Sequence, residues 1–347
     1  MGRATPATAR PGWASRAAWS PRAGNTAVPH VHPPLEHVIC PGDVRGAGPP
    51  GVTYEDSTSR RRPGPRGRAG KDLGWPSAAW SECPNFGPGA DPATLERWAL
   101  TVEGLGYDLL MLSDHVVITP DVAEQYPPPF YEPFTTLSWL AGITKRVHLG
   151  TTVLILPYRH PLLTARMAAN LQQLSGVRLV LGVGVGWARQ EFEALGVPFH
   201  RRGALTDEYI ETLRAAWADE RDYGPGRIPI WVGGNSEPGV RRAARLGDAW
   251  HPLRFRMPWL REMLDKAEVP ALVPRIVLRL TDTPITGPDR LAGEGTLDQV
   301  LADLAELREL GAETVVLDPF DGDPATTARP ETAWHALAAV ASRREQL

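Results

Sequence analysis

The chain has 347 residues, a formal net charge of −3 and an isoelectric point near 6.3. Such a balanced charge gives no overall field for binding nucleic acid or an anionic membrane, so it favours a small-molecule partner. The length suits one α/β barrel with appendages.

The first 80 residues differ in composition from the rest of the chain. They contain 12 Pro and 11 Gly but only eight Leu, Ile, Val or Phe, too few to offset the entropy of folding. They also carry 11 Lys and Arg against five Asp and Glu, including the run RRRPGPRGRAGK at 60–71. We predict a disordered or non-native arm at 1–80, removable near Gly74 without loss of stability, with a nucleic-acid or membrane tether as the minor alternative.

From residue 81 to 347 we predict one domain, in which short β-rich runs alternate with helical patterns. Eight candidate strands follow one another, the first of them weak in apolar residues: 78–83, 107–112, 147–155, 178–185, 228–233, 248–252, 275–280 and 314–318. Such runs, each separated by a helix, are typical of parallel sheets.

Amphipathic or alanine-rich segments follow the strands. The first, DPATLERWALTVEGLG at 91–106, has an Asp cap, a Pro at its first position and a Gly at its end. The others are expected at about 134–144, 160–174, 203–218, 237–246, 257–267, 296–310 and 331–345. Eight strands alternating with eight helices predict a (β/α)8 barrel (TIM barrel) in preference to an open doubly wound sheet.

In such a barrel the active site lies at the carboxyl ends of the strands. Polar and glycine residues gather at those predicted ends, at 113–115, 156–159, 184–187, 233–236, 250–251 and 318. The run LLMLSDHVV at 109–117 is informative because an ionisable pair, Asp114 and His115, interrupts apolar residues. We therefore expect the second strand to reach a cavity there.

Two glycine motifs follow. LGVGVGW at 181–187 places glycines at alternate strand positions, which leaves one face bare for a flat group or for close packing of the barrel. In WVGGNSEP at 231–238 a strand ends in two glycines before a helix begins, which suits either a phosphate site or an ordinary capped turn. We expect Gly234→Val to weaken phosphate binding without loss of the fold.

Two cysteines, Cys40 and Cys83, lie far apart and form no metal-binding or disulfide pattern. No run of about 18 apolar residues exists, and the amino terminus lacks the apolar stretch of a signal peptide. These features favour a cytoplasmic protein without a metal site.

Five motifs, in this order, resemble the luciferase-like monooxygenase superfamily, and within it the branch that uses the deazaflavin coenzyme F420. They are PNFGPGADP, GYDLLMLSDHV, HLGTTVLILPYRHP, RLVLGVGVGWARQEFEALG and IPIWVGGNSEPGVRRAARLGDAWHP. The resemblance as a whole covers about residues 83 to 320. The resemblance implies a luciferase-like barrel that binds F420 or a flavin at its carboxyl-end face.

The resemblance also implies roles for individual residues. The catalytic and cofactor-contacting pair maps to Asp114 and His115, and a non-prolyl cis peptide behind the ring maps to Thr152 and Val153. Further cofactor contacts map to the glycine strand and the phosphate-binding turn, namely Gly182, Gly184, Gly186, Gly233, Gly234 and Asn235. We expect Asp114 to accept hydrogen bonds from the cofactor and His115 to exchange the proton that accompanies hydride transfer.

Three features differ from similar proteins. F420-dependent glucose-6-phosphate dehydrogenases carry a catalytic glutamate where this chain has Trp187, which argues against that substrate. The segment at 218–227 is shorter than the usual insertion, and the first strand is less apolar.

The sequence thus predicts an F420-dependent oxidoreductase that transfers a hydride to or from a small organic substrate. An FMN-dependent monooxygenase and a non-catalytic ligand-binding barrel stay open as alternatives. The apolar segment YPPPFYEPF at 126–134 suggests either a lid over a hydrophobic substrate or a contact in a homodimer.

Overall fold

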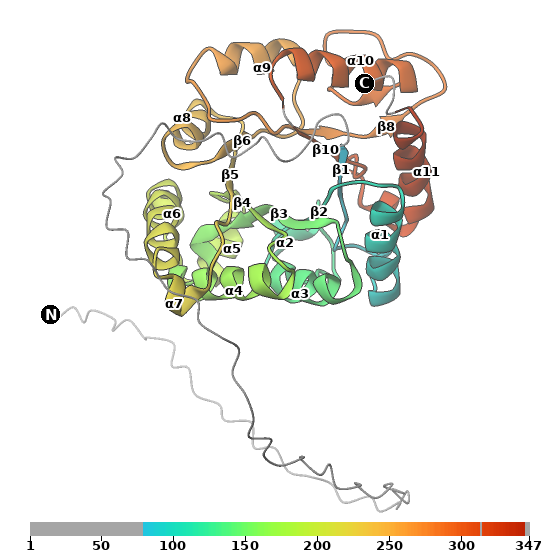
Figure 1. Ribbon diagram of the computed structural model, residues 1–347. Coiled ribbons are helices and arrows are strands. Elements are labelled where there is room, and N and C mark those ends of the chain that lie inside the picture. Colours follow the sequence, from blue (N-terminus) through green and yellow to red (C-terminus); the bar gives the residue numbers. More distant parts are fainter. Residues whose placement is uncertain (1–78, 313, 344–347) are drawn as a thin grey trace, which may run out of the picture. The chain divides into compact units, whose positions relative to one another are not determined.

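The computed structural model describes residues 79–312 and 314–343, so nearly all of the predicted arm at 1–80 lies outside the described residues. Eight parallel strands form one sheet in the order β6-β5-β4-β3-β2-β1-β10-β7 (Figure 1). They are β1 (Ala79–Glu82), β2 (Leu109–Leu112), β3 (His148–Ile155), β4 (Leu179–Gly184), β5 (Ile230–Gly233), β6 (Ala249–His251), β7 (Arg275–Val277) and β10 (Val315–Asp318).

The sheet closes on itself between β6 and β7. Two parallel bridges join the segments that extend these strands, Trp250 with Leu272 and Leu253 with Arg275. The amide of Arg275 donates to the carbonyl of Pro252 at 2.7 Å, which adds a hydrogen bond across the seam. The predicted (β/α)8 barrel is therefore confirmed.

The weak first strand is held by its neighbours. In β1, Ser81 lies opposite Leu110 of β2 and Leu317 of β10, so the strand is paired on both edges despite its few apolar residues. Its last residue, Glu82, is fully buried at the carboxyl end of the strand. The position of β1 thus follows from pairing more than from its own composition.

Helices surround the barrel (Figure 1). The predicted ones are present as α1 (Pro92–Gly104), α3 (Pro133–Ile143), α4 (Pro161–Leu174), α6 (Arg202–Trp217), α8 (Glu237–Leu246), α9 (Met257–Leu264), α10 (Leu297–Glu309) and α11 (Pro330–Ala341). Asp91 caps α1 as predicted, since its carboxylate accepts from the amide of Thr94 at 2.8 Å. In the described part of the chain, none of the helices is long and apolar enough to span a membrane.

Several short elements were not predicted from the sequence. They are the helices α2 (Pro120–Ala123), α5 (Arg189–Ala194) and α7 (Glu220–Tyr223), and the strand β9 (Glu294–Gly295). Each is too short to give a periodic apolar pattern, which explains why the sequence did not reveal it. The strand predicted at 275–280 is divided into β7 and β8 (Arg279–Leu280), and β8 pairs with β9 in a separate sheet.

The core has two layers because successive strand residues point to opposite faces. In β2, Leu109 and Met111 pack inside the barrel with Trp231 and Val316 among others. Leu110 and its alternating neighbours instead pack outward against the helices. The filled barrel interior supports the cavity that opens at its carboxyl end.

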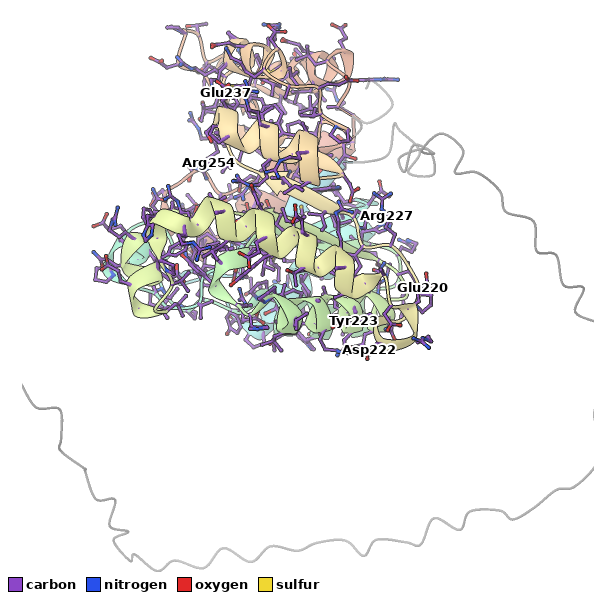
Figure 2. The ribbon with its side chains drawn as sticks, turned by 90° about the vertical axis from the view of Figure 1, so that its left-hand side faces the viewer. Glu220, Asp222, Tyr223, Arg227, Glu237 and Arg254 are labelled. Atoms are coloured by element: carbon purple, nitrogen blue, oxygen red, sulfur yellow. The ribbon has the colours of Figure 1, made fainter. Side chains whose placement is uncertain are left out.

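The short segment 218–227 lies away from that end. It forms α7, where Arg166 of α4 donates to the carbonyl of Asp222 at 2.6 Å and lies over the ring of Tyr223. Figure 2 shows Asp222 and Tyr223 near one end of α6, whereas Glu237 and Arg254, which follow β5 and β6, lie toward the other. The shortened segment therefore does not line the cavity described below.

Candidate active site

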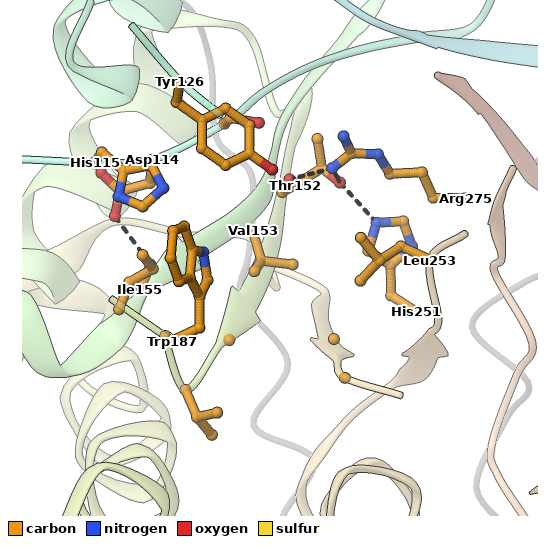
Figure 3. Close-up of a pocket in the computed structure, with 16 residues that line it drawn as sticks. Asp114, His115, Tyr126, Thr152, Val153, Ile155, Trp187, His251, Leu253 and Arg275 are labelled. Atoms are coloured by element: carbon orange, nitrogen blue, oxygen red, sulfur yellow. Dashed lines mark hydrogen bonds between the residues drawn. The ribbon is translucent and has the colours of Figure 1, made fainter. Parts of the chain in front are cut away.

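A cavity of about 230 Å³ opens at the carboxyl ends of the strands, where a (β/α)8 barrel places its active site. Its walls come from the ends of β2 to β7 and from Tyr126, in the loop after β2 (Figure 3). This volume is below the roughly 300–1,000 Å³ of pockets that enclose drug-sized ligands. The cavity therefore suits one ring system, with any longer part of a ligand extending past the mouth.

Eight of the residues singled out from the sequence line this cavity: Asp114, His115, Thr152, Val153, Gly184, Gly186, Gly233 and Gly234. Gly182 is not among the lining residues. A Cβ at this position would lie 2.0 Å from the carbonyl oxygen of Thr151, so the glycine allows close packing of β4 on β3. Asn235 is also outside the lining, and its Oδ1 accepts from the amide of Leu253 at 3.0 Å. In this structure Gly182 and Asn235 therefore contact neighbouring strands and loops of the protein and do not line the cavity.

His115 is held from one side by a buried carboxylate. Its Nδ1 lies 2.6 Å from Oε2 of Glu191, on α5, and the other oxygen of Glu191 accepts from the amides of Val116 and Val117. Tyr158 donates a further hydrogen bond to Glu191 at 2.9 Å. Burial alone would raise the pKa of Glu191, but the hydrogen bonds from His115 and the two amides outweigh it and lower that pKa. Glu191 therefore stays ionised and directs Nε2 of His115 away from itself.

Asp114 is occupied by protein donors. Arg159 binds both of its carboxylate oxygens, at 2.7 and 2.8 Å, and the amide of Ile155 donates to one of them at 2.9 Å. Glu132 accepts from the same guanidinium at 3.0 Å. With its side chain fully buried, Asp114 joins the ends of β2 and β3. This geometry does not favour the hydrogen bonds that Asp114 was expected to accept from a cofactor.

Val153 and the glycines beside it form an apolar floor to the cavity. The non-prolyl cis peptide implied by the resemblance is present between Thr152 and Val153. Glycines of the adjacent strands flank Val153: a Cβ at Gly184 would lie 2.4 Å from its Cγ2, and one at Gly233 would lie 2.9 Å from its Cγ1. Any larger residue at these positions would push into the floor, so the glycines keep it open for a planar group.

The turn after β5 has a backbone that favours glycine. Gly234 has a φ of +130°, a region that residues with a side chain rarely adopt. A valine at this position would be strained whatever the free space, so Gly234→Val should cost stability in addition to weakening phosphate binding. Helix α8 begins directly after this turn, and Ser236 makes no side-chain cap to it. The unpaired amides at the start of a helix suit an anion.

A buried ionic cluster adjoins the cavity. The guanidinium of Arg275 binds Oδ2 of Asp318 at 2.8 Å and also contacts Glu82, while its Nη1 donates to the carbonyl of Thr152 at 2.8 Å. Ser113, which lines the cavity, donates to Glu82 at 2.5 Å. Burial and the nearby Asp318 raise the pKa of Glu82 to about 8, although Arg275 opposes this shift. Glu82 is thus mainly protonated at neutral pH.

His251 forms part of the same network. Its Nδ1 lies 2.6 Å from the carbonyl oxygen of Val273, so Nδ1 carries the proton, and Nε2 accepts from the hydroxyl of Thr152 at 2.9 Å (Figure 3). Burial lowers the pKa of His251 to about 4. A neutral His251 therefore fixes the Thr152 side chain beside the floor.

Aromatic rings form the wall above His115. Tyr126, Phe130 and Trp187 have ring centroids 5.1, 5.5 and 5.9 Å from that of His115. Two of these rings, Tyr126 and Trp187, line the cavity itself. The surroundings of His115 are therefore apolar apart from Glu191.

The apolar segment 126–134 is anchored to the barrel. Asn85 donates to the carbonyls of Ser113 and Tyr131, at 3.0 and 2.6 Å, so it ties the segment to the end of β2. The amide of Gly87 also bonds to the carbonyls of two prolines in the segment. The segment is thus tied to the barrel, and its first residue, Tyr126, lines the cavity.

Several partners were not found from the sequence. Glu191 is 76 positions from His115, Arg159 is 45 from Asp114, and the partners of Arg275 lie more than 40 positions away in either direction. Only the closure of the barrel brings them together. The one available signal was the placement of Arg159 and Asp318 at predicted strand ends.

Comparisons with known proteins agree with this geometry. The profile of the luciferase-like monooxygenase family matches residues 76–269. An uncharacterized protein of Mycobacterium tuberculosis is 32% identical over 180 residues, which are 44% of this chain and 62% of that protein. A phthiodiolone/phenolphthiodiolone dimycocerosates ketoreductase of Mycobacterium kansasii is 30% identical over 261 residues, covering 62% of this chain and 70% of the ketoreductase.

Solved structures share the fold. An F420-dependent secondary alcohol dehydrogenase in complex with an F420-acetone adduct has a TM-score of 0.57 and 15% identity, over 76% of this chain and 98% of the other. A type II Baeyer-Villiger monooxygenase from the CAM plasmid of Pseudomonas putida, in complex with FMN, has a TM-score of 0.58 and 18% identity, over 76% and 96%. The chain spans less than two thirds of the M. tuberculosis relative.

Proposed function

Because the chain belongs to the luciferase-like monooxygenase family, we propose that it is an F420-dependent oxidoreductase that moves a hydride between the deazaflavin and a small organic substrate. The observation that carries this proposal is the His115–Glu191 pair at the side of a cavity with a glycine-flanked floor. An ionised carboxylate, an imidazole and a site for a planar ring are the parts that this chemistry requires.

The residues present fit a deazaflavin or flavin ring. Gly184 and Gly233 leave the floor around Val153 free of side chains that would obstruct a planar group. Gly233 and Gly234 also open the turn before α8, whose first amides would stabilise a phosphate. When bound, the deazaflavin accepts or donates a hydride at C5, and it lacks the N5 through which reduced flavins react readily with oxygen.

His115 would manage the proton. Since Glu191 accepts from Nδ1, the other ring nitrogen is the one that can take a proton from a substrate hydroxyl or return it. The buried carboxylate would stabilise the imidazolium that forms, and it holds the ring in one orientation. The surrounding aromatic rings would exclude water from this exchange.

F420 is favoured over FMN by two named relatives. One is a ketoreductase and the other an F420-dependent alcohol dehydrogenase, and both names describe interconversion of alcohols and ketones. An FMN-dependent monooxygenase is the second candidate, because an FMN-bound monooxygenase shares the fold.

A titration separates these candidates. The purified full chain, freed of any bound cofactor, is titrated with F420 and with FMN while the fluorescence of each cofactor is followed. We expect saturable binding of F420 and much weaker binding of FMN. Tighter binding of FMN would transfer the assignment to the monooxygenase, and binding of neither would favour a non-catalytic barrel.

A further inference from the structure

Three exposed apolar side chains belong to, or directly follow in sequence, residues that line the cavity. Trp187, which lines the cavity, is 45% exposed, and Val116 and Val117, directly after His115, are 44% and 36% exposed. Glu191 binds the amides of both valines, so their backbone is fixed relative to His115. An exposed apolar rim that is continuous with a cavity is typical of a ligand-binding surface.

The cations around this cavity are already engaged. Arg275 binds Asp318 and contacts Glu82, and Arg159 binds both oxygens of Asp114. Arg254 bonds to the carbonyl of Phe320 and lies 3.5 Å from Asp318. These three arginines are therefore committed to protein partners and are not free to pair with a substrate carboxylate or phosphate.

We infer that the substrate is an uncharged alcohol or ketone with an apolar body, which covers Trp187, Val116 and Val117 while its oxygen reaches His115. This inference rests on the proposed function and names its substrate class. A charged group lying on this rim would lose hydration without gaining an ion pair. An apolar body would instead remove the exposed indole and valine surfaces from water.

The chemistry of such a substrate balances at this site. In oxidation the carbinol C–H bond breaks, its electron pair passes with the hydrogen to oxidised F420, and the hydroxyl proton passes to Nε2 of His115. The carbonyl double bond forms as these bonds break. Reduction of the ketone is the reverse, with reduced F420 as the hydride donor and protonated His115 as the acid.

The test compares matched ligands on the full chain. The dissociation constants of 4-phenyl-2-butanone, of its 4-carboxyphenyl analogue and of glucose 6-phosphate are measured by calorimetry, with oxidised F420 and without it. A ketone and oxidised F420 cannot react, so binding is measured without turnover. We expect the neutral ketone to bind about ten-fold or more tightly than either charged ligand.

Two variants locate the contact. Trp187→Glu should weaken binding of the neutral ketone by about ten-fold, since a charge replaces apolar contact area. Trp139→Glu is the matched control, because Trp139 is 39% exposed on α3 and does not line the cavity. It should bind the ketone like the unchanged protein.

The outcomes separate this inference from the proposed function. Equal or tighter binding of a charged ligand, or equal effects of the two tryptophan variants, would overturn the substrate class even if F420 binds. Binding of F420 with no neutral ketone bound in either state would overturn it too. Preference for the neutral ketone in a chain that binds no F420 would uphold the substrate class and refute the cofactor.

Discussion

Glu82 provides a test of the buried charges beneath the cavity. The pKa of this carboxyl is raised from 4.5 to about 8, first by burial and then by Asp318. A raised pKa means that the folded state holds the proton more tightly than the unfolded state. The corresponding stability is fully present below pH 4.5 and is lost as the pH rises through about 8.

The magnitude follows from the shift. At about 1.4 kcal/mol per pKa unit, the difference between 4.5 and about 8 corresponds to about 5 kcal/mol. Glu82→Gln keeps the shape of the protonated acid but cannot ionise, and its amide oxygen can still accept from Ser113. The variant should therefore become more stable than the unchanged protein by several kcal/mol as the pH approaches 8.

Urea unfolding of both proteins from pH 5 to 8.5, followed by circular dichroism, measures this difference. Titrating groups remote from Glu82 contribute equally to the two proteins and cancel in the comparison. Glu96→Gln is the control, because Glu96 is exposed on α1, and it should leave the pH dependence unchanged. Parallel stability curves for Glu82→Gln and the unchanged protein would refute the assignment of a buried proton to Glu82.

Three further predictions concern the cavity. Arg159→Met leaves the buried carboxylate of Asp114 without its main partner and should destabilise the fold by about 3–5 kcal/mol. Adding Asp114→Asn should restore most of this lost stability. An unchanged melting temperature for Arg159→Met would contradict the anchoring role. His115→Asn should lower turnover by about 10²-fold and Glu191→Gln by about ten-fold, with F420 affinity nearly constant; near-normal turnover by the His115 variant would exclude it as acid or base. In Gly184→Ala the new Cβ would lie 2.4 Å from Cγ2 of Val153, so the variant should lose about 1–3 kcal/mol of stability and bind F420 more weakly. Unchanged F420 affinity would place the deazaflavin ring elsewhere.

The sequence predicted the strand order along the chain because most strands are short apolar runs between Gly, Pro or Asp boundaries, whereas β1 has few apolar residues. It also identified His115 correctly as a residue of the cavity, since an ionisable residue after four buried strand positions must reach a polar partner or an opening. The resemblance supplied the cis peptide between Thr152 and Val153. Local pattern and family likeness together were thus sufficient for the framework.

The partners of these residues could not be predicted in the same way. Glu191 reads as one more acid on a short helix, and nothing within its segment marks it as the residue that holds His115. Asp114 and Asn235 were assigned to a cofactor because their sequence positions match, whereas their atoms bind Arg159 and Leu253. Roles that depend on tertiary contacts require the closed barrel.

The crystal structure of the full chain with bound F420 tests the central claim most directly. We predict that the deazaflavin ring lies on the floor formed by Val153, between Gly184 and Gly233, with C5 facing the side of the cavity where His115 stands. The phosphate of the coenzyme should lie at the start of α8. A ring bound outside this cavity, or inside it with C5 directed away from His115, would contradict the account.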